Sequence, residues 1–169
     1  MNRQHTTEEY LALVRRIKEI LPNCSISQDM IIGFPTETEQ DHLDTLTLME
    51  QVRFVFGYMY KYSERPGTMA ARKFEDDVLE ETKKRRLMEV VDLQRKHSAE
   101  ITQSYVGKTV EVLIERASKK NPNEWSGRTE QSIVVVFPKE NYQPGDLVEV
   151  KIKSCTSATL IGTAVKNNK

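Results

Sequence analysis

The chain has 169 residues, of which 38% are hydrophobic and 30% are charged, and its formal net charge is zero. This composition is that of an ordinary globular protein, and the length allows one medium domain or two small ones. No apolar run approaches the roughly 20 residues of a membrane-spanning helix, and the first residues form no apolar signal-peptide segment, so we expect a cytoplasmic protein without membrane contact.

The charge is unevenly distributed along the chain. Residues 1–103 carry 15 Lys and Arg against 18 Asp and Glu, whereas residues 104–169 carry 10 against 7. The net charges are therefore −3 and +3. A basic bias in a small domain is compatible with nucleic-acid binding.

Cysteine and histidine give no sign of a metal site. Cys24 and Cys155 lie far apart and form no Cys-x-x-Cys pair, so we interpret them as ordinary reduced thiols. His5, His42 and His97 show no spacing typical of metal ligands. We predict all three to be surface residues and predict no metal site in this chain.

The first part of the chain alternates between helix and strand. Apolar residues at helical spacing, after a capping box that begins at Thr6, predict a helix over residues 7–21. Residues 26–34 predict a strand, and the near-continuous apolar run at its centre predicts cover on both faces.

A second helix and a second strand follow. The helix is expected to begin near Thr36 or Thr38 and to run to about Arg53, and residues 54–62 predict the strand. This alternation favours a parallel βαβ arrangement. Two strands make no stable sheet alone, so the sequence indicates the end of a larger α/β barrel or open sheet.

Residues 76–104 predict a long, highly charged helix. It carries a basic cluster, Lys83–Arg86, for which we favour a solvated helix face over an RNA contact.

The pattern changes from helical to alternating after Tyr105. Four alternating segments predict strands, with Pro- and Gly-containing turns between them: residues 109–115, 132–137, 147–152 and 158–162. Short strands at this spacing predict a small antiparallel β-barrel of the OB-like kind. We therefore expect two domains, residues 1–103 and residues 104–169.

Four stretches together resemble the methylthiotransferase branch of the radical S-adenosylmethionine (SAM) enzymes. They are Met1–Thr6, Ile31–Thr38, Tyr62–Thr68, and Ser118-Lys119-Lys120 with Gly127-Arg128-Thr129. The first three resemble the late strands of that family's partial (β/α) barrel. The fourth resembles its C-terminal TRAM domain, a small β-barrel associated with tRNA binding.

The resemblance implies an activity and its cofactors. It is greatest to the tRNA-modifying members, which add a 2-methylthio group to N6-isopentenyladenosine next to the anticodon. Such enzymes use SAM, two [4Fe–4S] clusters and an electron donor, and one SAM yields the radical that removes hydrogen from C2 while another supplies the methyl group. Alternatives are a methylthiotransferase for threonylcarbamoyladenosine in tRNA or for a ribosomal protein, and a non-catalytic RNA-binding module.

The chain departs from the family in its cysteines. The family's radical cluster uses a Cys-x3-Cys-x2-Cys loop, and its auxiliary cluster uses three cysteines of an N-terminal domain; this chain has neither set. It therefore resembles the C-terminal part of such an enzyme, with the N-terminal portion as a missing partner. We expect it to be inactive by itself and assign no catalytic residue to it.

The resemblance also suggests SAM-binding residues. The end of the first strand would lie beside the SAM adenine, which points to Asp29, Ile32, Gly33 and Phe34 as part of the SAM site. From the residues alone, Ile32 and Phe34 are explained as core and Gly33 as a turn. Arg65 follows the second strand and fits a SAM carboxylate, an RNA phosphate or an ordinary surface position.

In the predicted barrel, Lys119, Lys120 and Arg128 are expected to bind tRNA phosphates. Trp125 lies between them in sequence, and we favour a packing role for it over base stacking.

Overall fold

The structure is a computed structural model that describes residues 4–165. It divides into two compact units, with the division between His97 and Ser98. No helix within residues 4–165 is both long and apolar enough to span a membrane.

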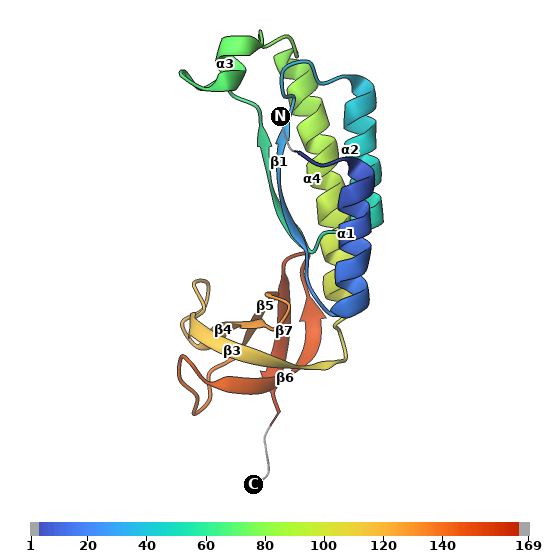
Figure 1. Cartoon of the computed structure of the whole chain (residues 1–169). Coiled ribbons are helices and arrows are strands. Elements are labelled where there is room, and N and C mark those ends of the chain that lie inside the picture. Colours follow the sequence, from blue (N-terminus) through green and yellow to red (C-terminus); the bar gives the residue numbers. More distant parts are fainter. Residues whose placement is uncertain (1–3, 166–169) are drawn as a thin grey trace. The chain divides into compact units, whose positions relative to one another are not determined.

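The first unit alternates helices and strands up to a long final helix (Figure 1). The elements are α1 (Thr7–Ile20), β1 (Ser27–Ile32), α2 (Glu39–Val52), β2 (Phe56–Lys61), α3 (Met69–Lys73) and α4 (Glu80–Gln103). The division between the units falls within α4. The predicted helices and strands are confirmed within a few residues, whereas the short α3 was not predicted.

Capping side chains set the starts of the helices. Thr6 and Glu9 form the predicted capping box of α1, in which each side chain accepts a hydrogen bond from the other residue's backbone N–H. Thr38, not Thr36, caps α2 and forms a second capping box with Asp41. Thr36 instead has a left-handed backbone, with φ of 72°.

The strands β1 and β2 pair in parallel, as predicted, with Ser27 opposite Phe56 and Ile32 opposite Lys61. In the described part of the chain, these two strands make up the whole sheet.

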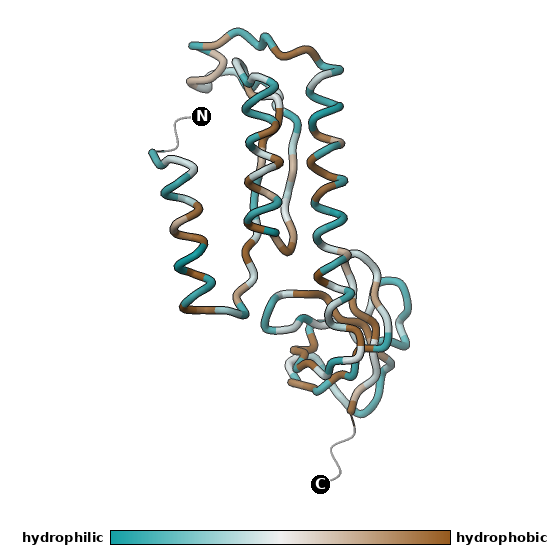
Figure 2. Tube along the Cα trace, turned by 90° about the vertical axis from the view of Figure 1, so that its right-hand side faces the viewer, coloured by the Kyte–Doolittle hydropathy of each residue, from teal (hydrophilic) through white to brown (hydrophobic). Residues whose placement is uncertain are grey.

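One face of this sheet packs against α1, α2 and α4, which Figure 1 shows on the same side of the two strands. The core between them is apolar and consists of Val14, Ile32, Met49, Val52, Phe54 and Val90. Figure 2 shows hydrophobic and hydrophilic residues alternating along α4, as expected of a helix with one apolar face.

The opposite face of the sheet is uncovered in the described residues. Side chains alternate between the two faces of a strand, and every second residue is exposed in both strands. The exposed apolar side chains are Ile31 (40%), Phe56 (38%), Tyr58 (59%) and Tyr60 (57%). The prediction of cover on both faces of β1 is therefore wrong for these residues, because an apolar side chain at Ile31 does not by itself supply a covering layer.

The second unit is a closed five-stranded barrel. Its strands are β3 (Thr109–Ala117), β4 (Glu124–Thr129), β5 (Val134–Pro138), β6 (Leu147–Cys155) and β7 (Thr159–Ala164), and their order around the barrel is β3-β4-β5-β7-β6. The barrel was predicted as antiparallel, but β5 and β7 pair in parallel. That part of the prediction is wrong because strand order depends on tertiary contacts.

The strand β4 was also not predicted, because its sequence Glu-Trp-Ser-Gly-Arg-Thr lacks the usual apolar alternation. With β4 included, the five strands fit an OB-like barrel. Its interior is filled by alternate residues of the strands, among them Val112, Ile114, Val135, Phe137, Val150, Ile152 and Leu160.

Candidate functional site

The loop that follows β1 is held against α4. Gly33 has φ of +74°, a backbone region that favours glycine. A Cβ at Gly33 would lie 2.4 Å from Cγ of Lys83. Glycine is therefore required here both for the turn and for the close approach of α4.

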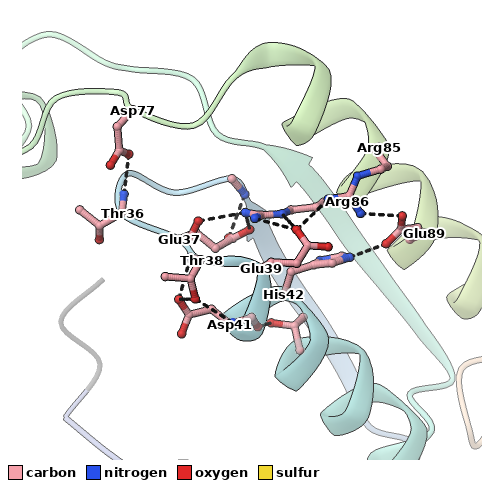
Figure 3. A network of polar contacts seen from close by, with 12 residues as sticks. Thr36, Glu37, Thr38, Glu39, Asp41, His42, Asp77, Arg85, Arg86 and Glu89 are labelled. Carbon is pink, nitrogen blue, oxygen red and sulfur yellow. Dashed lines mark hydrogen bonds and ion pairs between the residues drawn. The ribbon is translucent and has the colours of Figure 1, made fainter.

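Glu37 and Arg86 join this loop to α4. The Gly33 N–H donates to Oε2 of Glu37 at 2.9 Å. Arg86 Nη1 donates to Oε1 of Glu37 at 2.9 Å and to its carbonyl oxygen at 3.0 Å. Figure 3 shows the Arg86 guanidinium between the side chains of Glu37 and Glu39. One guanidinium thus fixes both the end of β1 and the start of α2.

The network continues along α2 and α4 (Figure 3). Glu39 Oε2 accepts from Arg85 Nη2 at 2.7 Å and from Arg86 Nη2 at 3.0 Å. These hydrogen bonds lower the pKa of Glu39 to about 2. Glu89 contacts His42 Nε2 at 2.6 Å and accepts from Arg85, and the hydrogen bond with His42 is the main reason that the pKa of Glu89 lies below its usual value.

Two predictions are wrong at this network. Lys83 and Arg86 are buried, at 1% and 4% exposure, so the basic cluster is not simply a solvated face. His42 is also buried, as is His97, whose Nε2 lies 3.0 Å from Oε2 of Glu50. Each of these buried side chains has a carboxylate partner: Asp76 for Lys83, Glu37 and Glu39 for Arg86, Glu89 for His42 and Glu50 for His97.

Lys83 has its own set of partners. Its Nζ donates to both carboxylate oxygens of Asp76 at 2.5 Å and lies 5.5 Å from the centre of the Tyr62 ring. Burial disfavours the charged form of Lys83, but the interactions with Asp76 and then Glu80 outweigh this effect and raise the pKa of Lys83. The buried ammonium therefore stays charged beside the end of β2.

A cavity of about 410 Å³ opens where β2 ends. Its walls combine apolar and aromatic side chains with hydroxyl and cationic groups, and the lining residues are Ile31, Tyr60, Lys61, Tyr62, Ser63, Arg65, Thr68 and Ala70. Arg65 is exposed, and its guanidinium has no hydrogen-bond or ion-pair partner among the described residues. The cavity can therefore accept a planar apolar group together with an anion.

Of the five residues predicted at the SAM site, Arg65 lines this cavity and the other four do not. Asp29 lies on the uncovered face of β1, in register with Tyr58. Ile32 belongs to the core, and Phe34 packs edge-to-face on Tyr62 and Phe74.

The barrel carries a second concave site, a groove of about 320 Å³. Its lining residues are Arg116, Ser118, Lys119, Lys120, Glu124, Ser126, Val136, Thr156, Thr159 and Ile161. The predicted pair Lys119 and Lys120 thus lies together in this groove, on the loop between β3 and β4.

Arg128 lies outside this set. Its Nε is 3.2 Å from Oε1 of Glu115, and its Nη1 donates to the Ser132 carbonyl at 3.1 Å. Trp125 is half-buried, with Nζ of Lys139 4.4 Å from the ring centre.

Sequence reasoning missed Arg116 as a member of the groove. Strict alternation with the buried Val112 and Ile114 would turn Arg116 inward. A bulge between Ile114 and Arg116 leaves both Glu115 and Arg116 exposed. No local pattern marks this bulge.

No group of three or more His, Cys, Asp or Glu side chains within residues 4–165 is arranged to hold a metal ion.

Both units of the chain have counterparts among known proteins. Residues 103–165 match the family model of the TRAM domain. Over 165 residues the chain is 66% identical to the tRNA-2-methylthio-N(6)-dimethylallyladenosine synthase of Flavobacterium johnsoniae and 65% identical to that of Christiangramia forsetii. It is 53% identical over 165 residues to the protein of that name from Chloroherpeton thalassium.

These matches cover 98% of this chain but 34%, 34% and 37% of the three relatives. The chain thus spans about a third of the length of the curated relatives it matches. Over that third, it is similar to the tRNA-2-methylthio-N(6)-dimethylallyladenosine synthases, and its barrel matches the TRAM domain.

Proposed function

We propose that this chain is part of a tRNA methylthiotransferase that adds a 2-methylthio group to N6-isopentenyladenosine (N6-dimethylallyladenosine) next to the anticodon. The observation that carries the proposal is the 66% identity, over 98% of the chain, to a relative named for this product. In this proposal the protein acts in the cytoplasm on the anticodon loop of tRNA and receives electrons from a donor.

The first unit would contribute strands to a radical SAM barrel that the rest of the protein completes. Two features support this. β1 and β2 are parallel and joined through a helix, as in (β/α) barrels. The sheet face with Ile31, Tyr58 and Tyr60 is uncovered in the described residues and would face the barrel interior.

SAM would bind at the carboxyl ends of these strands. The cavity beside Arg65 fits such a ligand, because Tyr60 and Ile31 can cover an adenine while the unpaired guanidinium can hold a carboxylate. Asp29 lies on the same face of β1 as Ile31. Since the Ile32 side chain is in the core and Gly33 is covered by Lys83, these two residues would contribute backbone groups only, and Phe34 would support Tyr62. SAM would supply the radical chemistry and the methyl group.

The residues present do not fit an iron–sulfur cluster. Each such cluster is held by at least three cysteine thiolates in the enzymes that the chain resembles, and the chain has two cysteines, Cys24 in the first unit and Cys155 in the second. The ligands of both [4Fe–4S] clusters would therefore come from the remainder of the protein, and we propose that this chain alone is catalytically inactive.

The TRAM barrel would bind tRNA. Lys119 and Lys120 support this role because they share a groove and have no ion-pair partner within residues 4–165. Arg128 is a weaker contact in this proposal, since Glu115 already neutralises much of its charge.

A chimera tests the proposed activity. The matching third of the Flavobacterium johnsoniae relative is replaced by this chain, and 2-methylthio-N6-dimethylallyladenosine is measured by mass spectrometry in tRNA from cells that otherwise lack it. We expect the chimera to restore the modified nucleoside and an Arg65→Met version to require more SAM. A folded chimera that binds tRNA but leaves the nucleoside unmethylthiolated contradicts the proposed reaction.

The inactivity of the chain alone has a separate test. After incubation with iron, sulfide and a reductant, we expect neither a stoichiometric [4Fe–4S] absorption spectrum nor cleavage of SAM. A chain that shows both contradicts this part of the proposal.

A further inference from the structure

The lining of the groove on the TRAM barrel combines unpaired cations with hydroxyl groups. Three of its residues are cations, Arg116, Lys119 and Lys120, and none of them has an ion-pair partner among the described residues. Four others carry hydroxyl groups: Ser118, Ser126, Thr156 and Thr159. Unpaired cations attract phosphates, and hydroxyl groups both donate to and accept from a ribose 2′-OH.

No aromatic side chain belongs to the described lining of this groove. Its apolar floor is formed by Val136 and Ile161, which are neighbours on β5 and β7. Trp125 precedes the groove residue Ser126 on β4, so its side chain points to the other side of the strand, where it is paired with the buried Phe137. Sites that hold single strands by their bases typically stack the bases on aromatic rings. The described lining of this groove offers no aromatic ring for such stacking.

The position of the groove on the barrel also favours the binding of a nucleic-acid strand. Oligonucleotides bind OB-like barrels on the second and third strands and at the loops after the first and fourth strands. In this barrel those strands are β4 and β5, and the loops hold Lys119, Lys120 and Thr156, all of which line the groove.

We propose that this groove binds the sugar–phosphate backbone of an unpaired RNA strand, through its phosphates and 2′-hydroxyl groups and without selecting bases. The inference deepens the proposed tRNA-binding role of the barrel and rests on it. Glu124 is the one carboxylate among the described lining residues, and it opposes the approach of phosphate.

The test measures binding of the whole chain to labelled 12-nucleotide strands by fluorescence anisotropy over a range of salt concentrations. The strands are oligo-U, oligo-A and oligo-dU, and a tRNA serves as a further ligand. We expect oligo-U and oligo-A to bind within about threefold of each other, and oligo-dU to bind at least fivefold more weakly, because it lacks the 2′-OH.

Charge variants locate the site. Arg116→Gln with Lys119→Gln and Lys120→Gln should weaken oligo-U binding at least tenfold. The same change should reduce the slope of log K against log salt by about 2, since each phosphate contact on a single strand contributes about 0.7. The control removes three exposed cations outside the groove, as Lys108→Gln, Lys151→Gln and Lys153→Gln, and should change binding less than threefold.

Two further variants separate recognition of the ribose 2′-OH from the effect of charge. Ser126→Ala with Thr159→Val should reduce the preference for oligo-U over oligo-dU at least twofold and leave the salt slope unchanged. Glu124→Gln should tighten binding of all strands about two- to fivefold. Thermal unfolding of each variant confirms that the barrel is folded.

Three results overturn the inference while leaving RNA binding in place. They are a more than tenfold difference between oligo-U and oligo-A, equal binding of oligo-U and oligo-dU, and a control triple variant that loses as much affinity as the groove variant. If the unchanged chain binds neither tRNA nor any oligonucleotide, the proposed role of the barrel falls as well.

Discussion

Arg86 holds together the part of the first unit that carries the candidate SAM site. It comes from α4 and is 4% exposed, and its guanidinium contacts Glu37 and Glu39 across 49 and 47 positions of the chain. Glu37 in turn accepts from the backbone N–H of Gly33. Removing one partner of a buried, hydrogen-bonded ion pair leaves the other charge uncompensated, which typically costs more than the pair itself contributes.

The variant Arg86→Met should therefore lower the free energy of unfolding by about 3 kcal/mol. Lys84→Met is the matched control, because Lys84 is exposed on the same helix and has no ion pair within residues 4–165, and it should change stability by less than about 0.5 kcal/mol. Urea denaturation of both variants gives the comparison. Equal stability of the two variants would show that the Arg86 network contributes nothing.

The same network predicts a dependence on acid. The pKa of Glu39 is about 2 in the folded chain because of its hydrogen bonds with Arg85 and Arg86, against an ordinary value of 4.5. A carboxylate with a lowered folded pKa stabilises the fold above its unfolded pKa, and this contribution is lost as the pH falls toward the folded pKa. Glu39→Gln should thus lower the melting temperature at pH 7, and the difference from the unchanged chain should shrink between pH 4.5 and about pH 2. A difference that stays constant over this range contradicts the assignment.

At two places in the barrel, a bulge in one strand lies opposite a glycine of the neighbouring strand. In β3 the register shifts between Ile114 and Arg116, opposite Gly127 of β4. In β6 it shifts between Ile152 and Ser154, opposite Gly162 of β7. Bulges and glycines bend strands sharply, and such bends are how a small sheet closes into a barrel.

Gly127→Ala should therefore destabilise the barrel, because the added Cβ would lie 2.2 Å from the Leu113 carbonyl oxygen. We expect a loss of about 1–3 kcal/mol, as for other changes that overfill a packed site. Ser126→Ala, at the next position of β4, is the control and should have little effect. Thermal unfolding followed by circular dichroism measures both, and an unchanged midpoint for Gly127→Ala would contradict the close approach of the strands.

At the scale of the whole molecule, the chain leaves an apolar surface without cover. Ile31, Phe56, Tyr58 and Tyr60 all lie on one face of the two-stranded sheet, and no third strand pairs with it in the described part of the chain. Uncovered apolar faces and open strand edges promote association between copies.

The isolated chain should consequently self-associate at micromolar to millimolar concentrations. Phe56→Lys with Tyr58→Lys should shift the mass found by size-exclusion chromatography with light scattering toward the 19.5 kDa of one chain. Leu113→Lys with Leu147→Lys is the control, since these exposed residues face each other on the barrel. A control that restores the monomer equally well would place the association surface elsewhere.

Local pattern was sufficient for much of the fold. The capping box of α1, the two strands of the parallel pair and four of the barrel strands depend on periodicity and on residues a few positions apart, so they were predictable. The strand β4 was missed because its consecutive Ser126, Gly127 and Arg128 give no alternation of apolar and polar residues. The strand nevertheless pairs with β3 on one side and with β5 on the other.

The order of helices and strands, the change to a barrel after α4 and the grouping of Lys119 with Lys120 follow from the amino-acid sequence alone. Which charges are buried and which face the groove depends on the folded structure. Lys83 and Arg86 look like surface cations in the sequence, but in the folded unit Asp76, seven positions away, neutralises Lys83, and Glu37, 49 positions away, neutralises Arg86. Arg116 faces the groove because of a bulge that forms only when β3 pairs with β4 and β6. The burial of Arg86 and the position of Arg116 both depend on partners in other segments of the chain, and the energy of a buried charge depends on such partners.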